Sequence, residues 1–175
     1  MQKLQTQHLT RAAAVGAAYA VLSLFSSVFS LTFGVVQCRF SEALCVLPFF
    51  FPETVWGLFA GCLITNLLSP YGLLDLIVGS LATLIAALWT AHVPKRWMAP
   101  IPPVLCNMVI VGAEIAWFET NGFGSAFFAA WAWNGLTVGI GEAAACGLVG
   151  TLLLRVLPRI PALRSLMQPE RLGAI

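Results

Sequence analysis

Long apolar runs separated by short polar strings make up most of this sequence. A helix of about 20 apolar residues crosses the roughly 30 Å hydrocarbon layer of a membrane. The run at 43–51 is shorter and stops at Pro52, so it predicts a short or tilted helix. The pattern predicts an all-α integral membrane protein, a bundle of about six transmembrane helices with the second one short. The expected segments are 12–33, 43–51, 54–68, 73–93, 102–118 and 127–157.

Composition agrees with this pattern and leaves little room for a soluble part. Of the 175 residues, 59% are hydrophobic and 9% are charged, whereas soluble domains carry roughly 25% charged residues. We therefore expect a single membrane domain over 1–175, ending in a short basic tail at 158–175.

Positive charges predict the orientation of the bundle, because Lys and Arg concentrate in cytoplasmic connections. With six crossings, eight of the nine Lys and Arg residues fall on one side, which predicts that both termini are cytoplasmic. These eight are Lys3, Arg11, Lys95, Arg96, Arg155, Arg159, Arg164 and Arg171. The exception is Arg39, in a connection placed outside.

A small set of polar residues lies at membrane depth, where charged groups are costly and usually have a functional or pairing role. The set is Arg39, Glu42, Asn66, Asp75, Asn107, Glu114, Asn134 and Glu142. Asn107 and Glu114 are seven residues apart and therefore share one helical face.

Structural roles for these residues remain open alternatives. Arg39 and Glu42, three residues apart, are spaced for a salt bridge. Asp75 is placed to interact with a helix dipole, and Asn66 to end a helix. The amides of Asn107 and Asn134 and the carboxylates of Glu114 and Glu142 suit interhelical hydrogen bonds. Trp117, Trp131 and Trp133 fit an interfacial aromatic belt or a pocket wall.

The first segment carries small residues at four-residue spacing, as Ala13/Ala17 and Ala14/Ala18. Such a face permits close approach of another helix, either within the bundle or from a partner. The motifs of phosphate-binding loops, serine hydrolases and zinc proteases are missing from the sequence. We therefore expect no ATP hydrolysis by this chain, no cofactor and no metal, and small-molecule binding is the default hypothesis.

Several strings in order along the chain resemble the QueT family, the substrate-binding (S) components of energy-coupling factor (ECF) importers. They are FSEAL at 40–44, VLPFF at 46–50, GCLITNLLSP at 61–70, GLLD at 72–75, GSLATL at 79–84, PPVLCN at 102–107, VGAE at 111–114 and GIGE at 139–142. The family is associated with uptake of queuosine precursors, which are 7-substituted deazaguanines.

The resemblance implies a six-helix S component in the bacterial cell membrane that binds its substrate from outside. It also implies as partners a membrane coupling subunit (EcfT-like) and two ATP-hydrolysing subunits. The alanines of the first segment resemble the AxxxA surface by which S components dock, in the register of Ala13 and Ala17 or of Ala14 and Ala18.

The expected ligand suits these polar residues. A guanine-like edge presents two donors that one carboxylate, Glu114 or Glu142, accepts together. Asn107 or Asn134 complements the remaining positions, and the rings of Phe40, Trp117 or Trp133 stack on the heterocycle. Arg39 and Glu42 complete the expected site.

Other functions remain alternatives. The polar groups also suit an S component for another heterocyclic vitamin, and an intramembrane enzyme or a purely structural subunit ranks lower. The sequence leaves open whether the precursor is the nitrile or the aminomethyl form. A cationic aminomethyl group gains from an additional carboxylate such as Glu42, but pairing of Glu42 with Arg39 would remove that argument.

Overall fold

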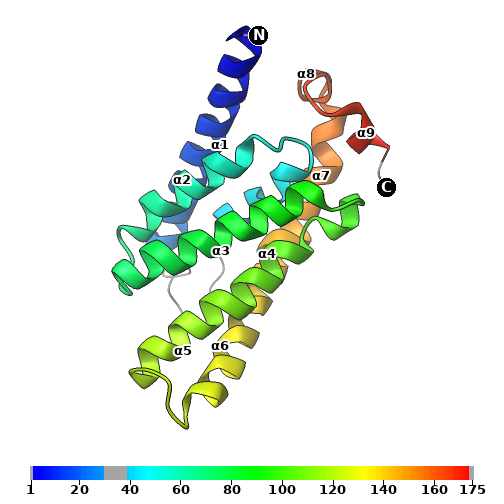
Figure 1. The fold of residues 1–175 in the computed structure, drawn as a ribbon. Coiled ribbons are helices and arrows are strands. Elements are labelled where there is room, and N and C mark those ends of the chain that lie inside the picture. The colour runs from blue at the N-terminus through cyan, green and yellow to red at the C-terminus, as the bar shows by residue number, and fades with distance from the viewer. Residues whose placement is uncertain (1, 30–38, 174–175) are drawn as a thin grey trace.

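A computed structural model describes residues 2–29 and 39–173, and these fold into helices without any strand (Figure 1). The helices are α1 (Gln2–Val28), η1 (Phe40–Phe49), α2 (Thr54–Asn66), α3 (Leu73–His92), η2 (Arg96–Met98), α4 (Ile101–Cys106), η3 (Asn107–Val111), α5 (Gly112–Thr120), α6 (Phe127–Glu142), η4 (Ala143–Gly150), α7 (Thr151–Val156), η5 (Leu157–Arg159), α8 (Pro161–Arg164) and α9 (Pro169–Leu172). The prediction of an all-α protein is confirmed.

Within the described residues, 4 helices are long and apolar enough to cross a membrane: Gln5–Val28, Leu73–His92, Arg96–Thr120 and Phe127–Arg159. Phe40–Phe49 and Thr54–Asn66 are apolar but shorter. The first helix already begins at Gln2, ten residues before the expected start at 12, because its polar first turns are helical as well. Its expected end at 33 lies outside the described residues.

The short second element is a 3₁₀-helix, η1, and not an α-helix. It contains Pro48, which has no backbone N–H to donate within a helix. A 3₁₀-helix rises about 2.0 Å per residue against about 1.5 Å in an α-helix. The ten residues of η1 therefore reach about 20 Å, farther into the bundle than an α-helix of the same length.

Helices α1 and α2 pack with their backbones in contact through glycines. A Cβ added at Gly57 would lie 1.9 Å from the carbonyl oxygen of Ala12, and one at Gly61 would lie 2.5 Å from that of Gly16. Small residues permit this approach in membrane helix pairs. Helices α5 and α6 are similarly close, since a Cβ at Gly112 would lie 2.7 Å from Cα of Gly135.

Both chain ends gather at one end of the molecule, and the connection between α5 and α6 lies at the other (Figure 1). At the first end, Arg171 donates to the carbonyl oxygens of Ala91, at 2.8 Å, and of Val93. Arg11 donates to Leu166 O at 3.4 Å. The C-terminal tail is thus attached to α1 and to the end of α3.

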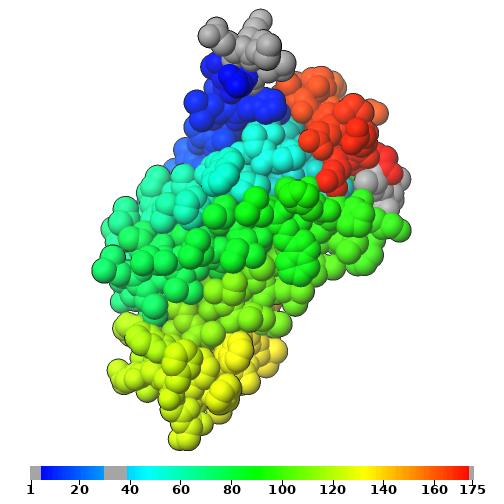
Figure 2. Space-filling model, in the orientation of Figure 1, coloured from blue at the N-terminus to red at the C-terminus, as the bar shows by residue number. Residues whose placement is uncertain are grey.

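Helices α2 and α3 lie side by side across one face of the bundle (Figure 2). Beneath them is an apolar core that contains Tyr19, Phe49, Phe50, Leu58 and Leu154, all nearly inaccessible to solvent. Large apolar side chains such as Leu73 and Ile77 point outward instead. Exposed apolar surface on a helical bundle is typical of a protein surrounded by lipid.

Candidate functional site

A small polar cavity lies inside the bundle, between η1, α3, η3 and α6. It is lined by Arg39, Glu42, Asp75, Gly79, Thr83, Asn107, Val111, Val138 and Glu142. Its volume is about 10 Å³, the space of a single water molecule. Four of the lining side chains carry ionisable charges, which is an unusual concentration at membrane depth.

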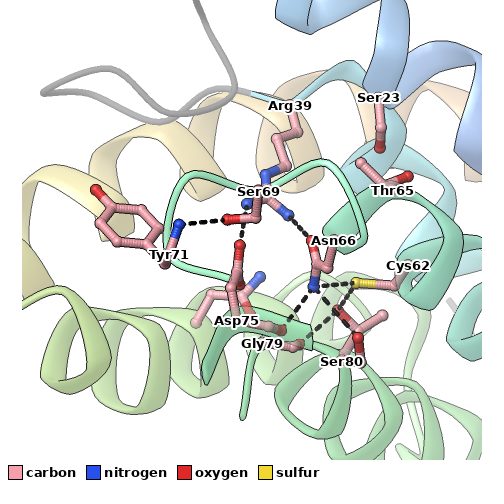
Figure 3. A network of polar contacts seen from close by, with 12 residues as sticks. Ser23, Arg39, Cys62, Thr65, Asn66, Ser69, Tyr71, Asp75, Gly79 and Ser80 are labelled. Carbon is pink, nitrogen blue, oxygen red and sulfur yellow. Dashed lines mark hydrogen bonds and ion pairs between the residues drawn. The ribbon is translucent and has the colours of Figure 1, made fainter. Parts of the chain in front are cut away.

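Arg39 is held at this cavity by residues of α2 and α3 (Figure 3). Its Nη1 donates to Asn66 Oδ1 at 3.3 Å, and its Nη2 lies 3.7 Å from Asp75 Oδ2. Arg39 therefore forms its ion pair with Asp75 on α3. The three-residue spacing had suggested Glu42 as the partner, and this suggestion is replaced by Asp75. Asp75 lies in the first turn of α3, as expected, but its side chain faces inward and not toward the helix end.

Asn66 is the central residue of this network, although its position at the end of α2 suggested only a turn residue. Its amide nitrogen lies 3.0 Å from Asp75 O, 3.2 Å from Ser80 Oγ and 3.4 Å from Cys62 Sγ. The residue is 1% exposed. A fully buried amide with several partners fixes the relative positions of its neighbours. Asn66 thus connects the end of α2 to α3 and orients Arg39.

Glu42 on η1 and Glu142 at the end of α6 both line the cavity. Glu42 Oε1 accepts a hydrogen bond from the hydroxyl of Tyr19, and its Oε2 accepts one from Cys45 Sγ at 3.1 Å. Glu142 Oε1 accepts from Asn107 Nδ2 at 2.8 Å. Cys146 Sγ lies 3.0 Å from Glu42 O and 3.5 Å from Glu142 Oε2, so both glutamates flank one thiol.

The helical geometry changes at this site. Asn107 begins a π-helical stretch, η3, within the long helix from α4 to α5. Glu142 is the last residue before a second π-helical stretch, η4. π-helical turns are rare and are frequent at functional sites, because the wider turn redirects side chains.

Glu114 lies on α5, between the cavity and the α2–α3 connection. Its carboxylate is close enough to interact electrostatically with Asp75 and Arg39, and Tyr71 of that connection is close enough to interact with Glu114. The residue is 5% exposed, and both its oxygens are buried without a hydrogen-bond partner among the described residues. A native protein rarely leaves a buried carboxylate unsatisfied, so this group needs an explanation.

The remaining expected contact residues lie away from the cavity. Asn134 donates to Glu119 Oε2 at 2.7 Å, which joins α6 to α5. Trp117 and Trp133 are exposed, Trp133 by 60% of its surface. Phe40 is exposed and packs against Phe25, with ring centroids 6.3 Å apart. In this arrangement the aromatic rings do not line the cavity.

The alanines of the expected docking face are exposed. Ala13, Ala14, Ala17 and Ala18 all point away from the bundle. The contact with α2 uses the next register of α1, through Ala12 and Gly16. Helix α1 thus has two faces of small residues. The face with Ala12 and Gly16 packs against α2, and the face with the four alanines is exposed.

Among the described residues, no group of three or more His, Cys, Asp or Glu side chains could hold a metal ion. Comparison with known proteins gives a clearer direction. A family model described as "QueT transporter" matches residues 9–159. A relative in Lactococcus lactis subsp. cremoris (strain MG1363), named "Queuosine precursor transporter QueT", is 34% identical over 85 residues. That alignment spans 49% of this chain and 50% of the relative. No solved structure matches the chain.

Proposed function

Since the chain belongs to the QueT transporter family, we propose that it captures a queuosine precursor, a 7-substituted deazaguanine, for uptake. The observation that carries this proposal is the pair of unpartnered oxygens on Glu114. The edge of a guanine-like ring presents a ring N–H and an exocyclic amine, two donors that one carboxylate accepts together. Such a ligand satisfies both oxygens at once.

The residues around Glu114 support the same ligand class. Asn107 lies seven residues before Glu114 on the same long helix and supplies an amide that can complement a ring carbonyl or N–H. Glu142 and Glu42 add carboxylates at the cavity, and Arg39 adds a guanidinium. The cavity of about 10 Å³ is smaller than any heterocycle, so binding requires the surrounding helices to move apart.

We further propose that the chain acts as the S component of an ECF importer with six membrane crossings. In this proposal both termini are cytoplasmic, and ATP is hydrolysed by two partner subunits in the bacterial cell membrane. The gathering of the basic chain ends at one end of the bundle supports this orientation. The exposed alanines of α1 are the proposed contact with the coupling subunit. The chain itself carries no cofactor in this proposal.

Equilibrium binding tests the substrate. Purified full-length chain in detergent is titrated with deazaguanine precursors, guanine and unrelated heterocyclic vitamins. Saturable binding of deazaguanines, weakened at least about tenfold by Glu114→Gln, is the expected result. Glu170→Gln is the control, because Glu170 is an exposed carboxylate on α9 that does not line the cavity. Binding of a different vitamin, or of nothing by folded protein, would overturn the proposed substrate.

Co-purification tests the partners. The double variant Ala13→Leu/Ala17→Leu should reduce the yield of complex with the coupling subunit and ATPases while leaving substrate binding unchanged, because bulky side chains prevent close helix approach. Ala129→Leu, at an exposed alanine on α6, is the control. Undiminished complex formation in this variant and in Ala14→Leu/Ala18→Leu would exclude this face as the docking surface.

A further inference from the structure

An apolar groove lies on the surface of the bundle between α1 and α7. Leu22 and Phe25 form its wall on α1, Val156 belongs to its wall on α7, and η1, which packs against both helices, forms its floor. We propose that this groove binds an acyl chain of an anionic phospholipid, whose phosphate is held by Arg155 and Arg159. The inference concerns the membrane around the protein, and it does not depend on the proposed substrate.

The lining of this groove suits a hydrocarbon chain. Every lining residue is apolar, and the groove encloses about 610 Å³, within the usual range of about 300–1,000 Å³ for pockets that bind small molecules. Phe25 and Phe40, with ring centroids 6.3 Å apart, lie at the end far from the chain termini, since Phe25 is close to the end of α1. Val156 lies at the other end, close to the C-terminal tail. The groove therefore runs along the helices, as the acyl chains of a surrounding membrane do.

Two arginines continue the groove at the end where the chain termini gather. Leu152 and Val156 line it from the long helix Phe127–Arg159. Arg159 follows Val156 by three residues on the same helical face, and Arg155 directly precedes Val156. Both arginines are exposed. A guanidinium binds phosphate oxygens through two parallel N–H donors, and basic sites beside transmembrane helices bind anionic lipid headgroups.

The charges of these two arginines have no counterpart within the protein. Neither side chain forms an ion pair or a hydrogen bond with the residues that the structure describes. Arg155 and Arg159 are four residues apart, a spacing at which like charges on a helix repel each other. Arg11 and Arg171 at the same end are, by contrast, held by protein groups. A phosphate between Arg155 and Arg159 removes their repulsion and supplies the missing negative charge.

A transmembrane helix of a partner subunit is the alternative occupant. Helices approach each other closely through small residues, as α1 and α2 do at Gly57. The groove walls instead carry large side chains, including Leu22, Phe25, Val149 and Leu152, which keep a helix backbone away. A flexible acyl chain fills such an irregular surface, and its phosphate also accounts for the two unpaired arginines. The groove therefore favours a lipid over a helix.

Photo-crosslinking in nanodiscs tests the site. The purified full-length chain is placed in phosphatidylcholine bilayers that contain a trace of photoactivatable phosphatidylglycerol or phosphatidylcholine with identical acyl chains, and mass spectrometry locates the adducts. Phosphatidylglycerol should label residues 22–25 and 149–156 at least about tenfold more than phosphatidylcholine does. At Ile77 and Leu81, which are exposed on α3, the two lipids should label equally.

A matched pair of charge variants assigns the selectivity. Arg155→Gln/Arg159→Gln should remove the excess labelling by phosphatidylglycerol, because the phosphate loses both guanidinium groups. Lys95→Gln/Arg96→Gln loses the same charge at the same end of the molecule and should retain the excess.

A second pair of variants tests the groove itself. Val149→Trp should fill the groove and reduce its labelling by phosphatidylglycerol several-fold, because Val149 is one of the lining residues. Leu148→Trp is the control, since Leu148 is exposed but does not line the groove.

Three outcomes would overturn the inference. The first is equal labelling of the groove by the two lipids in the unmutated chain, which needs no variant to fold. The second is an excess of phosphatidylglycerol adducts that persists in Arg155→Gln/Arg159→Gln. The third is a Val149→Trp variant that gives less complex with the coupling subunit while its lipid labelling is unchanged, because the groove then holds a partner helix and not a lipid.

Discussion

Asn107 and Glu142 join two long helices at the positions where both change from α-helical to π-helical geometry. Nδ2 of Asn107 donates to Oε1 of Glu142 at 2.8 Å, and both residues are buried. Asn107 is the first residue of η3, and Glu142 immediately precedes η4. The hydrogen bond therefore sets the spacing of the two helices at the polar cavity.

This relationship predicts a rescue between two substitutions. Asn107→Asp replaces the amide donor with a carboxylate facing another carboxylate, and should lower the free energy of unfolding by roughly 2–4 kcal/mol. Adding Glu142→Gln restores a donor between the two side chains and should recover most of that loss. Chemical unfolding in detergent measures both values.

The control for this pair is Asn121→Asp, at the end of α5, where the residue has a left-handed backbone (φ 53) that Asp also tolerates. It should change stability by less than about 0.5 kcal/mol. A double variant no more stable than Asn107→Asp alone would contradict the hydrogen bond as the cause.

Glu114 should show opposite effects on stability and on binding. Glu114→Gln removes a buried carboxylate without a described hydrogen-bond partner, so the empty protein should gain roughly 1 kcal/mol or more of stability. The same change should weaken deazaguanine binding at least about tenfold. Thermal unfolding without ligand and with saturating ligand measures both effects, because bound ligand adds stability according to its affinity.

The expected result is that the variant melts at a higher temperature than the unmutated chain without ligand and at a lower one with ligand. Loss of stability without ligand would indicate that Glu114 has an internal partner, and would remove the main argument for its role in binding.

The sequence predicted the helices well because five of the six expected segments have 15 to 31 residues, and apolar runs of that length leave few alternatives in a membrane. It predicted a short helix at 43–51 but not the 3₁₀ geometry of η1, and it did not predict the π-helical stretches. Those stretches, η3 and η4, depend on contacts between helices distant in the sequence, which hydrophobic periodicity does not report.

For the site, the rule that polar residues at membrane depth are functional identified most of the cavity lining, including Glu42, Asn107 and Glu142. It left Asp75 and Asn66 with local roles, because each lies near a helix end where a local explanation is available. Apart from Cys62, which lies 4 residues before Asn66, their partners are 9 or more residues away in the sequence. Local spacing therefore offered Glu42 as one possible partner of Arg39, whereas the three-dimensional arrangement pairs Arg39 with Asp75.

The Arg39–Asp75 pair should be far more important to stability than an exposed charge. Arg39→Gln leaves Asp75 buried without its counter-charge, and should cost roughly 3–5 kcal/mol of unfolding free energy. Asp75→Asn in the same chain should recover most of this cost. Arg155→Gln, at an exposed arginine, should change stability by less than about 0.5 kcal/mol. Similar losses in Arg39→Gln and the double variant would show that Arg39 acts through other contacts.

The backbone contact between α1 and α2 predicts a position that tolerates only glycine. A methyl group at Gly57 would lie 1.9 Å from the carbonyl oxygen of Ala12, so Gly57→Ala must push the helices apart and should cost about 1–3 kcal/mol. Gly147→Ala is the matched control, because no described atom lies within 4 Å of the added methyl group. It should be neutral or stabilising by up to about 1 kcal/mol, since alanine favours helices over glycine. Thermal unfolding in detergent compares the two, and equal melting temperatures would show that α1 and α2 do not pack this closely. Separation of α1 from α2 also tilts the exposed face of Ala13 and Ala17, so Gly57→Ala should weaken complex formation with the proposed coupling subunit more than Gly147→Ala does.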